Sequence, residues 1–133
     1  MFASPEVSWT IRRSRGPDGY YALLQLADAA MIERGAGLDL FTNQSLDRKQ
    51  EDFLRLASDL RHVYEPVAEN FLPSAIHSAF RAFATSDPGR VIDTYRDALF
   101  ANRAENSAPE DLQRWRMATD ARLAAYVELI GQA

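Results

Sequence analysis

The chain has 133 residues, of which 47% are hydrophobic and 26% charged, and it contains no cysteine. This is the composition of one ordinary globular domain, and the lack of cysteine excludes disulfides, thiol nucleophiles and iron–sulfur clusters. The 19 acidic and 15 basic residues give a net charge of −4, which argues against a nucleic-acid partner. We therefore expect a single domain over residues 1–133.

The N-terminal residues show the periodicity of a strand. Val7, Trp9 and Ile11 alternate with polar residues, and turn-forming residues follow at 16–19. We expect residues 1–19 to form an extended arm and turn. Residues 20–34 fit either a helix or the second strand of a hairpin, and their helix-forming composition favours the helix. A loop is expected over residues 35–43.

The next segment is predicted to form an amphipathic helix. It begins near Ser45 and ends near Tyr64, because Pro66 cannot donate a hydrogen bond within a helix. Apolar residues recur along it at intervals of three, four and seven, which predicts the stripe that faces the core. This stripe consists of Leu46, Phe53, Leu56, Leu60, Val63 and Val67.

Three further helices are predicted from their first residues. Pro73 suits the first turn of a short helix, and Ser86 or Asp87 can cap the next. The last helix is the most clearly marked, since Ser107 and Glu110 form a capping box around a proline, and it runs to Gly131. The patterns predict a mainly α fold: an antiparallel bundle of four to five helices with an N-terminal extended arm or β-hairpin. An α+β fold with a small N-terminal sheet is the alternative.

One group of residues has spacing compatible with metal ligands. Asp59, His62, Glu65 and Glu69 follow one another at three, three and four residues, and His77 can approach from the next helix. Pro66 interrupts this register, and the chain has only two histidines. We therefore expect no metal and no other cofactor.

No catalytic or phosphate-binding motif is present, so the sequence favours a non-enzymatic role without deciding the question. We expect an interaction module: a small adaptor or regulator of bacterial or phage origin with a protein partner. The candidate partner-binding residues are those of the arm, which combine an apolar face with the densest basic cluster: Val7, Trp9, Ile11, Arg12, Arg13 and Arg15.

The remaining expectations concern assembly, location and an alternative function. Arms of this kind can join two copies of the chain in a homodimer. No apolar run approaches the roughly 20 residues that a membrane span needs, so we expect a cytoplasmic protein. The alternative function is a helical bundle that binds a small molecule, or an enzyme, with a pocket among Tyr64, His77, Tyr95 and Trp115.

Overall fold

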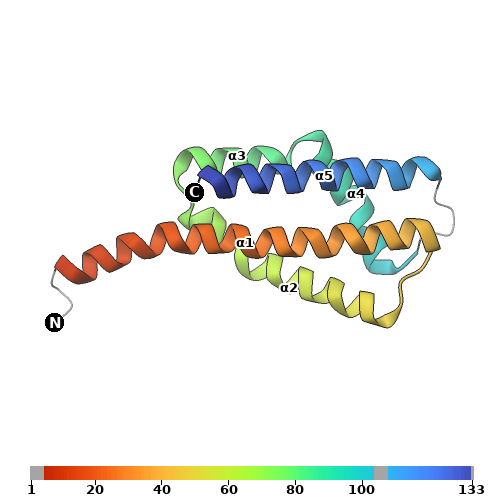
Figure 1. Ribbon diagram of the computed structural model, residues 1–133, viewed down its shortest axis with the longest axis horizontal. Coiled ribbons are helices and arrows are strands. Elements are labelled where there is room, and N and C mark those ends of the chain that lie inside the picture. The colour runs from red at the N-terminus through yellow and green to blue at the C-terminus, as the bar shows by residue number, and fades with distance from the viewer. Residues whose placement is uncertain (1–4, 104–107, 133) are drawn as a thin grey trace.

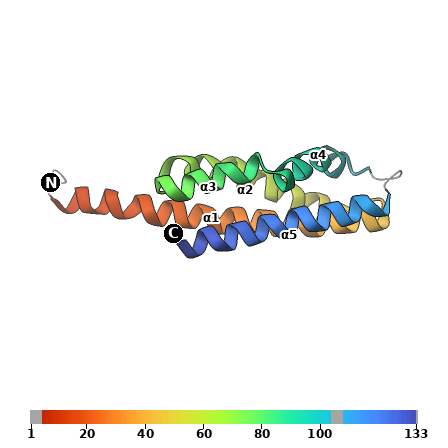
Figure 2. The same ribbon diagram turned by 90° about the horizontal axis from the view of Figure 1, so that it is seen from above.

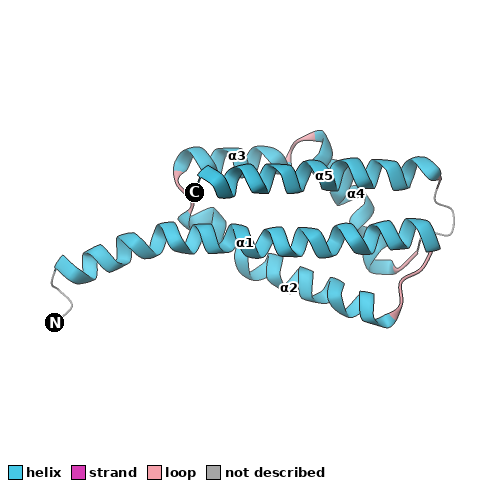
Figure 3. Cartoon of the chain, in the orientation of Figure 1, coloured by secondary structure: helices cyan, strands magenta, loops and turns pink. Residues whose placement is uncertain are grey.

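The computed structural model describes residues 5–103 and 108–132, with side chains from residue 18 onward. These residues form five α-helices and no strand (Figure 3). The helices are α1 (Pro5–Asn43), α2 (Arg48–Phe71), α3 (Ser74–Ala84), α4 (Asp87–Ala101) and α5 (Pro109–Gln132). The prediction of a mainly helical protein is confirmed.

The helices form a bundle of four rods. α1 and α5 lie side by side, and α2 covers another side of α1 (Figures 1 and 2). The short helices α3 and α4 follow one another along α5 and together take the place of one long helix. The N-terminal part of α1 projects beyond the ends of the other helices (Figure 1).

The N-terminal arm is the main difference from the predicted fold. Residues 5–19 are helical and continue into α1 without a break, and so do residues 35–43, where a loop was expected. Three alternating apolar residues are a short signal. A helix nucleated in the segment 20–34 can extend in both directions, because each added residue except Pro17 gains a hydrogen bond. The arm, the hairpin and the small sheet are therefore not supported.

α2 begins and ends at other residues than predicted. Its N-cap is Asp47, which accepts a hydrogen bond from the Gln50 backbone at 2.8 Å, while the Gln50 side chain accepts one from the Asp47 backbone at 3.1 Å. The helix continues through Pro66 to Phe71. Pro66 lies on the exposed side of the helix, where water can bond to the carbonyl group four residues earlier.

The predicted stripe of α2 faces the bundle only in part. Leu46 is buried in one core and Val67 packs against another, but Phe53, Leu56 and Val63 are 45%, 46% and 57% exposed. The buried residues of α2 are instead Leu54, Ala57 and Ala68. Two of these are alanines, whose small side chains allow α1 to approach closely. Within the described residues, no helix is long and apolar enough to cross a bilayer.

α3, α4 and α5 follow the predicted boundaries closely. Ser86 caps α4 as expected, with its hydroxyl oxygen accepting from the Gly89 backbone at 3.3 Å. Ser107, the predicted cap of α5, lies outside the described residues. At this end of α5 the Asp111 side chain accepts hydrogen bonds from the Ala108 backbone, at 2.8 Å, and from the Tyr95 hydroxyl.

The end of α4 is tied to the loop before α2. Asn102 has a left-handed backbone conformation, with φ at 54°. Its side-chain oxygen accepts from the Leu46 backbone N–H at 2.6 Å, and its side-chain nitrogen donates to the Leu46 carbonyl at 3.0 Å. One amide side chain thus satisfies both backbone groups of a loop residue.

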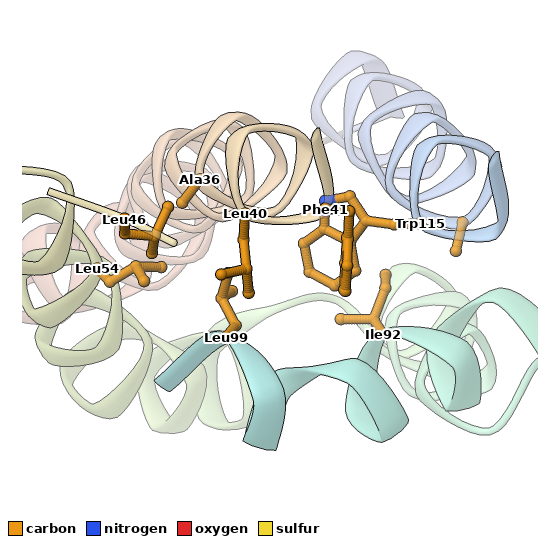
Figure 4. Packing of buried hydrophobic residues seen from close by; sticks show 9 residues of the cluster. Ala36, Leu40, Phe41, Leu46, Leu54, Ile92, Leu99 and Trp115 are labelled. Carbon is orange, nitrogen blue, oxygen red and sulfur yellow. The ribbon is translucent and has the colours of Figure 1, made fainter. Parts of the chain in front are cut away.

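Two apolar cores fill the bundle, one toward each end. The first, the aromatic core, is shown in Figure 4 and consists of Ala36, Leu40, Phe41, Leu46, Leu54, Ile92, Leu99, Trp115 and Ala118. The second, the aliphatic core, consists of Ala22, Leu23, Leu26, Ala68, Leu72, Ile76 and Leu129. Along α1, α2 and α5 about three to four helical turns separate the nearest residues of the two cores.

Trp115 is the centre of the aromatic core. It is fully buried, and the rings of Phe41 and Tyr95 meet it edge-on at centroid distances of 6.0 and 6.4 Å. Its Nε1 donates to the Arg34 carbonyl of α1 at 3.1 Å. A Cβ atom at Gly37 would lie 2.1 Å from this nitrogen, so the close approach of Trp115 to α1 requires glycine at position 37.

Candidate anion-binding site

The gap between the two cores holds a buried carboxylate. Glu33 of α1 is 0% exposed, and three arginines from three other helices surround it: Arg61 of α2, Arg96 of α4 and Arg122 of α5. We call these four residues the charged layer. Each belongs to the core-facing stripe of its own helix, which places charge where the pattern elsewhere places apolar side chains.

Arg96 makes the most regular contact with Glu33. Its Nε and Nη2 each donate to one carboxylate oxygen at 3.1 Å, in the paired geometry that suits a guanidinium and a carboxylate. Its remaining nitrogen, Nη1, donates to Asp93 at 2.9 Å. All three guanidinium nitrogens of Arg96 are therefore in use.

The other two arginines keep unused donors. Arg122 donates to Glu33 at 2.8 Å and to the Ala30 carbonyl at 3.3 Å, and Arg61 Nε lies 3.5 Å from Glu33. Within the described residues, the Nε atoms of Arg61 and Arg122 are buried and have no hydrogen-bond partner. A buried donor without a partner is costly, so these atoms mark a place where an acceptor is missing.

The charged layer keeps its charges despite burial. Burial is the largest single influence on Glu33 and favours its neutral form, but Arg122, Arg96 and Arg61 together outweigh it and hold the pKa of Glu33 below its ordinary value. For Arg96 burial acts in the opposite direction, yet the attraction of Glu33 raises the pKa of Arg96. Glu33 and Arg96 are therefore an ionised pair at neutral pH.

A cavity of about 290 Å³ adjoins this layer, between α3, α4, α5 and the second half of α2. Arg96 and Arg122 lie in its wall. The apolar part of the wall comes from Phe80, Phe83, Ile92, Tyr126 and Leu129. Three carboxylates, Glu65, Glu69 and Asp93, also line it.

The carboxylates in the cavity wall are partly neutralised by their neighbours. Asp93 pairs with Arg96, and Glu69 lies 2.7 Å from His77 Nε2 and 3.9 Å from Arg81. The three arginines of the charged layer make direct ion pairs with two carboxylates, Glu33 and Asp93. Glu65 in the same wall is a third carboxylate near these arginines, so the charges of this group balance. The place for an anion is marked by the Nε donor of Arg122, which has no described partner.

A comparison with known families identifies the chain. Residues 14–132 match the family model described as nitrate and nitrite sensing (NIT). The chain belongs to the NIT family. No curated protein and no solved structure matches it significantly. Membership in a family that senses small anions overturns the predicted adaptor function and supports the alternative, a helical bundle that binds a small molecule.

The adaptor prediction failed because it took the absence of catalytic and phosphate-binding motifs as evidence that the chain binds no small molecule. A NIT chain needs no nucleophile and no glycine-rich loop, since a few guanidinium groups suffice to hold a small oxyanion. Such groups come from separate helices and leave no local motif. The signal that was present is one charged residue within each apolar stripe: Glu33 follows Leu26 and Ala30, and Arg122 follows Trp115 and Ala118.

The pocket predicted from the sequence does not form in this NIT chain. Tyr95 and Trp115 pack in the aromatic core, while Tyr64 packs against the aliphatic core. His77 approaches Glu69, as predicted, but none of these four predicted residues lines the cavity. The described residues contain no cluster of three or more side chains suited to a metal, and metal content stays a prediction.

The predicted partner-binding residues occupy the first turns of α1. Val7, Trp9, Ile11, Arg12, Arg13 and Arg15 have a helical backbone, and their side chains lie outside the described part of the chain. Their contact with a protein partner, a homodimer and a cytoplasmic location stay predictions for this NIT chain. The helical backbone removes one argument for such a contact, since no unpaired strand is present at residues 5–19.

Proposed function

We propose that the chain senses nitrate or nitrite by binding the anion in the cavity beside the charged layer, with Arg122 and Arg96 as its main contacts. The observation that carries this proposal is Arg122. It is buried in the cavity wall with an Nε donor that no described residue engages. An oxyanion oxygen supplies the missing acceptor.

The chemistry of the ligand suits this site. Nitrate and nitrite are small, planar and singly charged, and their oxygens only accept hydrogen bonds at neutral pH. A guanidinium group is also planar, always charged and a donor only. The apolar side chains in the wall, among them Phe80 and Ile92, lower the local dielectric and so strengthen such charged hydrogen bonds.

Binding is tested by replacing Arg122 with lysine. The wild-type protein is expected to bind nitrate and nitrite in calorimetric titration at fixed ionic strength. Arg122→Lys keeps the charge, but a lysine ammonium cannot reproduce the fork that contacts Glu33 and Ala30 while Nε stays available. We expect its dissociation constant for nitrate to rise about tenfold or more.

Arg116→Lys is the matched control, because Arg116 lies on the same helix, is exposed and does not line the cavity. Its nitrate affinity should equal that of the wild type. Circular dichroism establishes that both variants are folded. A wild-type protein that binds neither anion, or equal loss of affinity in both variants, contradicts the proposal.

A further inference from the structure

We infer that Glu33 sets the charge selectivity of the site, so that the site accepts a singly charged oxyanion and rejects a doubly charged one of similar size. The inference rests on the proposed function and adds a specificity-determining residue to it. Glu33 acts here as a resident anion that belongs to the protein and occupies guanidinium donors which an external anion would otherwise use.

The count of charges around the site disfavours a divalent anion. Arg61, Arg96 and Arg122 are paired directly with Glu33 and Asp93, and Glu65 adds a third carboxylate in the cavity wall, so these six charges balance. A divalent anion brings one negative charge more than a monovalent anion into this balanced group, and uncompensated charge near a buried carboxylate is strongly unfavourable.

Glu33 contributes more to this count than Asp93. The Glu33 side chain is 0% exposed and touches all three arginines, whereas the Asp93 side chain is 65% exposed and pairs with Arg96 alone. Water and salt screen an exposed charge far more than a buried one. The full charge of Glu33 therefore acts on an anion in the cavity.

Glu33 also occupies donors that an external anion would use. Of the five N–H groups of each guanidinium, it engages two on Arg96 and one on Arg122, the two charged-layer arginines in the cavity wall. Sulfate has four oxygens and two charges to desolvate, so the loss of these three donors costs sulfate more than nitrate.

The test replaces Glu33 with glutamine and measures two anions. Sodium nitrate and sodium sulfate are titrated separately at one fixed ionic strength, with binding followed by calorimetry and by the midpoint of thermal unfolding. Glu33→Gln raises the net charge of the charged layer by one and keeps the side-chain shape. We expect its sulfate affinity to rise about tenfold or more, and its preference for nitrate over sulfate to fall.

Asp28→Asn is the control, since Asp28 is an exposed residue of the same helix and the change in net charge is identical. It should alter neither affinity by more than about twofold, because exposed charges are screened. A second variant, Glu33→Gln with Arg61→Gln, restores the net charge of the wild-type charged layer. We expect it to prefer nitrate again, although both of its changes lie at the charged layer.

The outcomes separate this inference from the proposed function. If the wild type binds no nitrate but Glu33→Gln gains sulfate binding that Asp28→Asn lacks, the proposed function fails and the role of Glu33 stands. If the wild type binds nitrate and a folded Glu33→Gln gains no sulfate affinity, the inference is overturned. Should Glu33→Gln not fold, the double variant is compared with Arg61→Gln alone: a higher sulfate affinity in the double variant supports the inference, and an equal affinity overturns it.

Discussion

The aromatic core and the charged layer lie next to each other in the bundle and are built on opposite principles. Around Trp115 the side chains are closely packed and their polar atoms are satisfied. Two aromatic rings meet the indole edge-on, the indole nitrogen donates to a backbone carbonyl, and Gly37 has no space for a side chain. Around Glu33 the contacts are ionic, two buried donors have no described partner, and a cavity adjoins them. A ligand has no donor to satisfy around Trp115, whereas around Glu33 it can accept hydrogen bonds from donors that have no described partner.

The largest expected effect is a loss of stability in both regions, which an added carboxylate should reverse only at the charged layer. Glu33→Ala leaves three buried guanidinium groups without their shared carboxylate and should lower the free energy of unfolding by about 3–5 kcal/mol. Leu40→Ala, at a fully buried position of the aromatic core, should cost about 2–5 kcal/mol by leaving an apolar cavity. Sodium formate, compared with sodium chloride of equal ionic strength, is expected to raise the unfolding midpoint of Glu33→Ala only.

Formate supplies the missing carboxylate to the charged layer, whereas it does not bind in the apolar cavity that Leu40→Ala leaves, because an unpaired charge is unfavourable there. Chemical denaturation with and without formate measures the recovery. Equal recovery in both variants would show that formate acts on the protein as a whole, and no recovery in Glu33→Ala would show that the arginines hold Glu33 for packing alone.

The next effect tests how tightly the aromatic core is packed. Gly37→Ala forces a methyl group against Trp115 and should lower the free energy of unfolding by about 2 kcal/mol, even after the gain in helix propensity. Gly35→Ala is the matched control on the same helix: it is exposed, and no atom lies within 4 Å of the added carbon. It should stabilise the protein by about 0.5–1 kcal/mol. Two changes of the same sign would contradict this account of the core.

The smallest effect is a dependence of stability on pH, and it belongs to the charged layer. The pKa of Glu33 is lower in the folded protein than in the unfolded chain, so its contribution is present above the unfolded pKa of about 4.3. It is lost as the pH falls below that value through the folded pKa, at about 1.4 kcal/mol for each pKa unit between the two states. The stability difference between wild type and Glu33→Gln should therefore shrink in acid, and a difference independent of pH would argue against an ionised Glu33.

The sequence predicted the fold where local signals agree with the packing. The proline and serine residues at the starts of α3 and α4 mark these helices correctly, because capping is decided by a few neighbouring residues. Pro66 misled the prediction of the end of α2. The energetic cost of a proline within a helix depends on whether water can bond to the carbonyl group that loses its partner, and the sequence alone does not show this. The stripe with Phe53 and Leu56 also misled the prediction of α2. Two faces of this helix carry apolar residues, and packing against α1 determines which of them is buried.

The candidate site could not be predicted by the same reasoning. Hydrophobic periodicity assigns a charged residue to the outside, and Glu33 and Arg122 break that rule together. Each is tolerable only in the presence of the other, and they are 89 residues apart in the chain. Nothing local in either segment identifies its partner, so the charged layer becomes visible only when the four helices are assembled.

Asn102 shows how one side chain can be required for two unrelated reasons. Its left-handed backbone suits glycine or asparagine, and its contacts with Leu46 require a group that both donates and accepts. Glycine can adopt the left-handed backbone but makes neither hydrogen bond to Leu46. Aspartate can accept from the Leu46 nitrogen but cannot donate to the Leu46 carbonyl. Position 102 thus works like a rung of a β-ladder built from a side chain, and it couples the end of α4 to the start of α2 in a protein whose described residues form no strand.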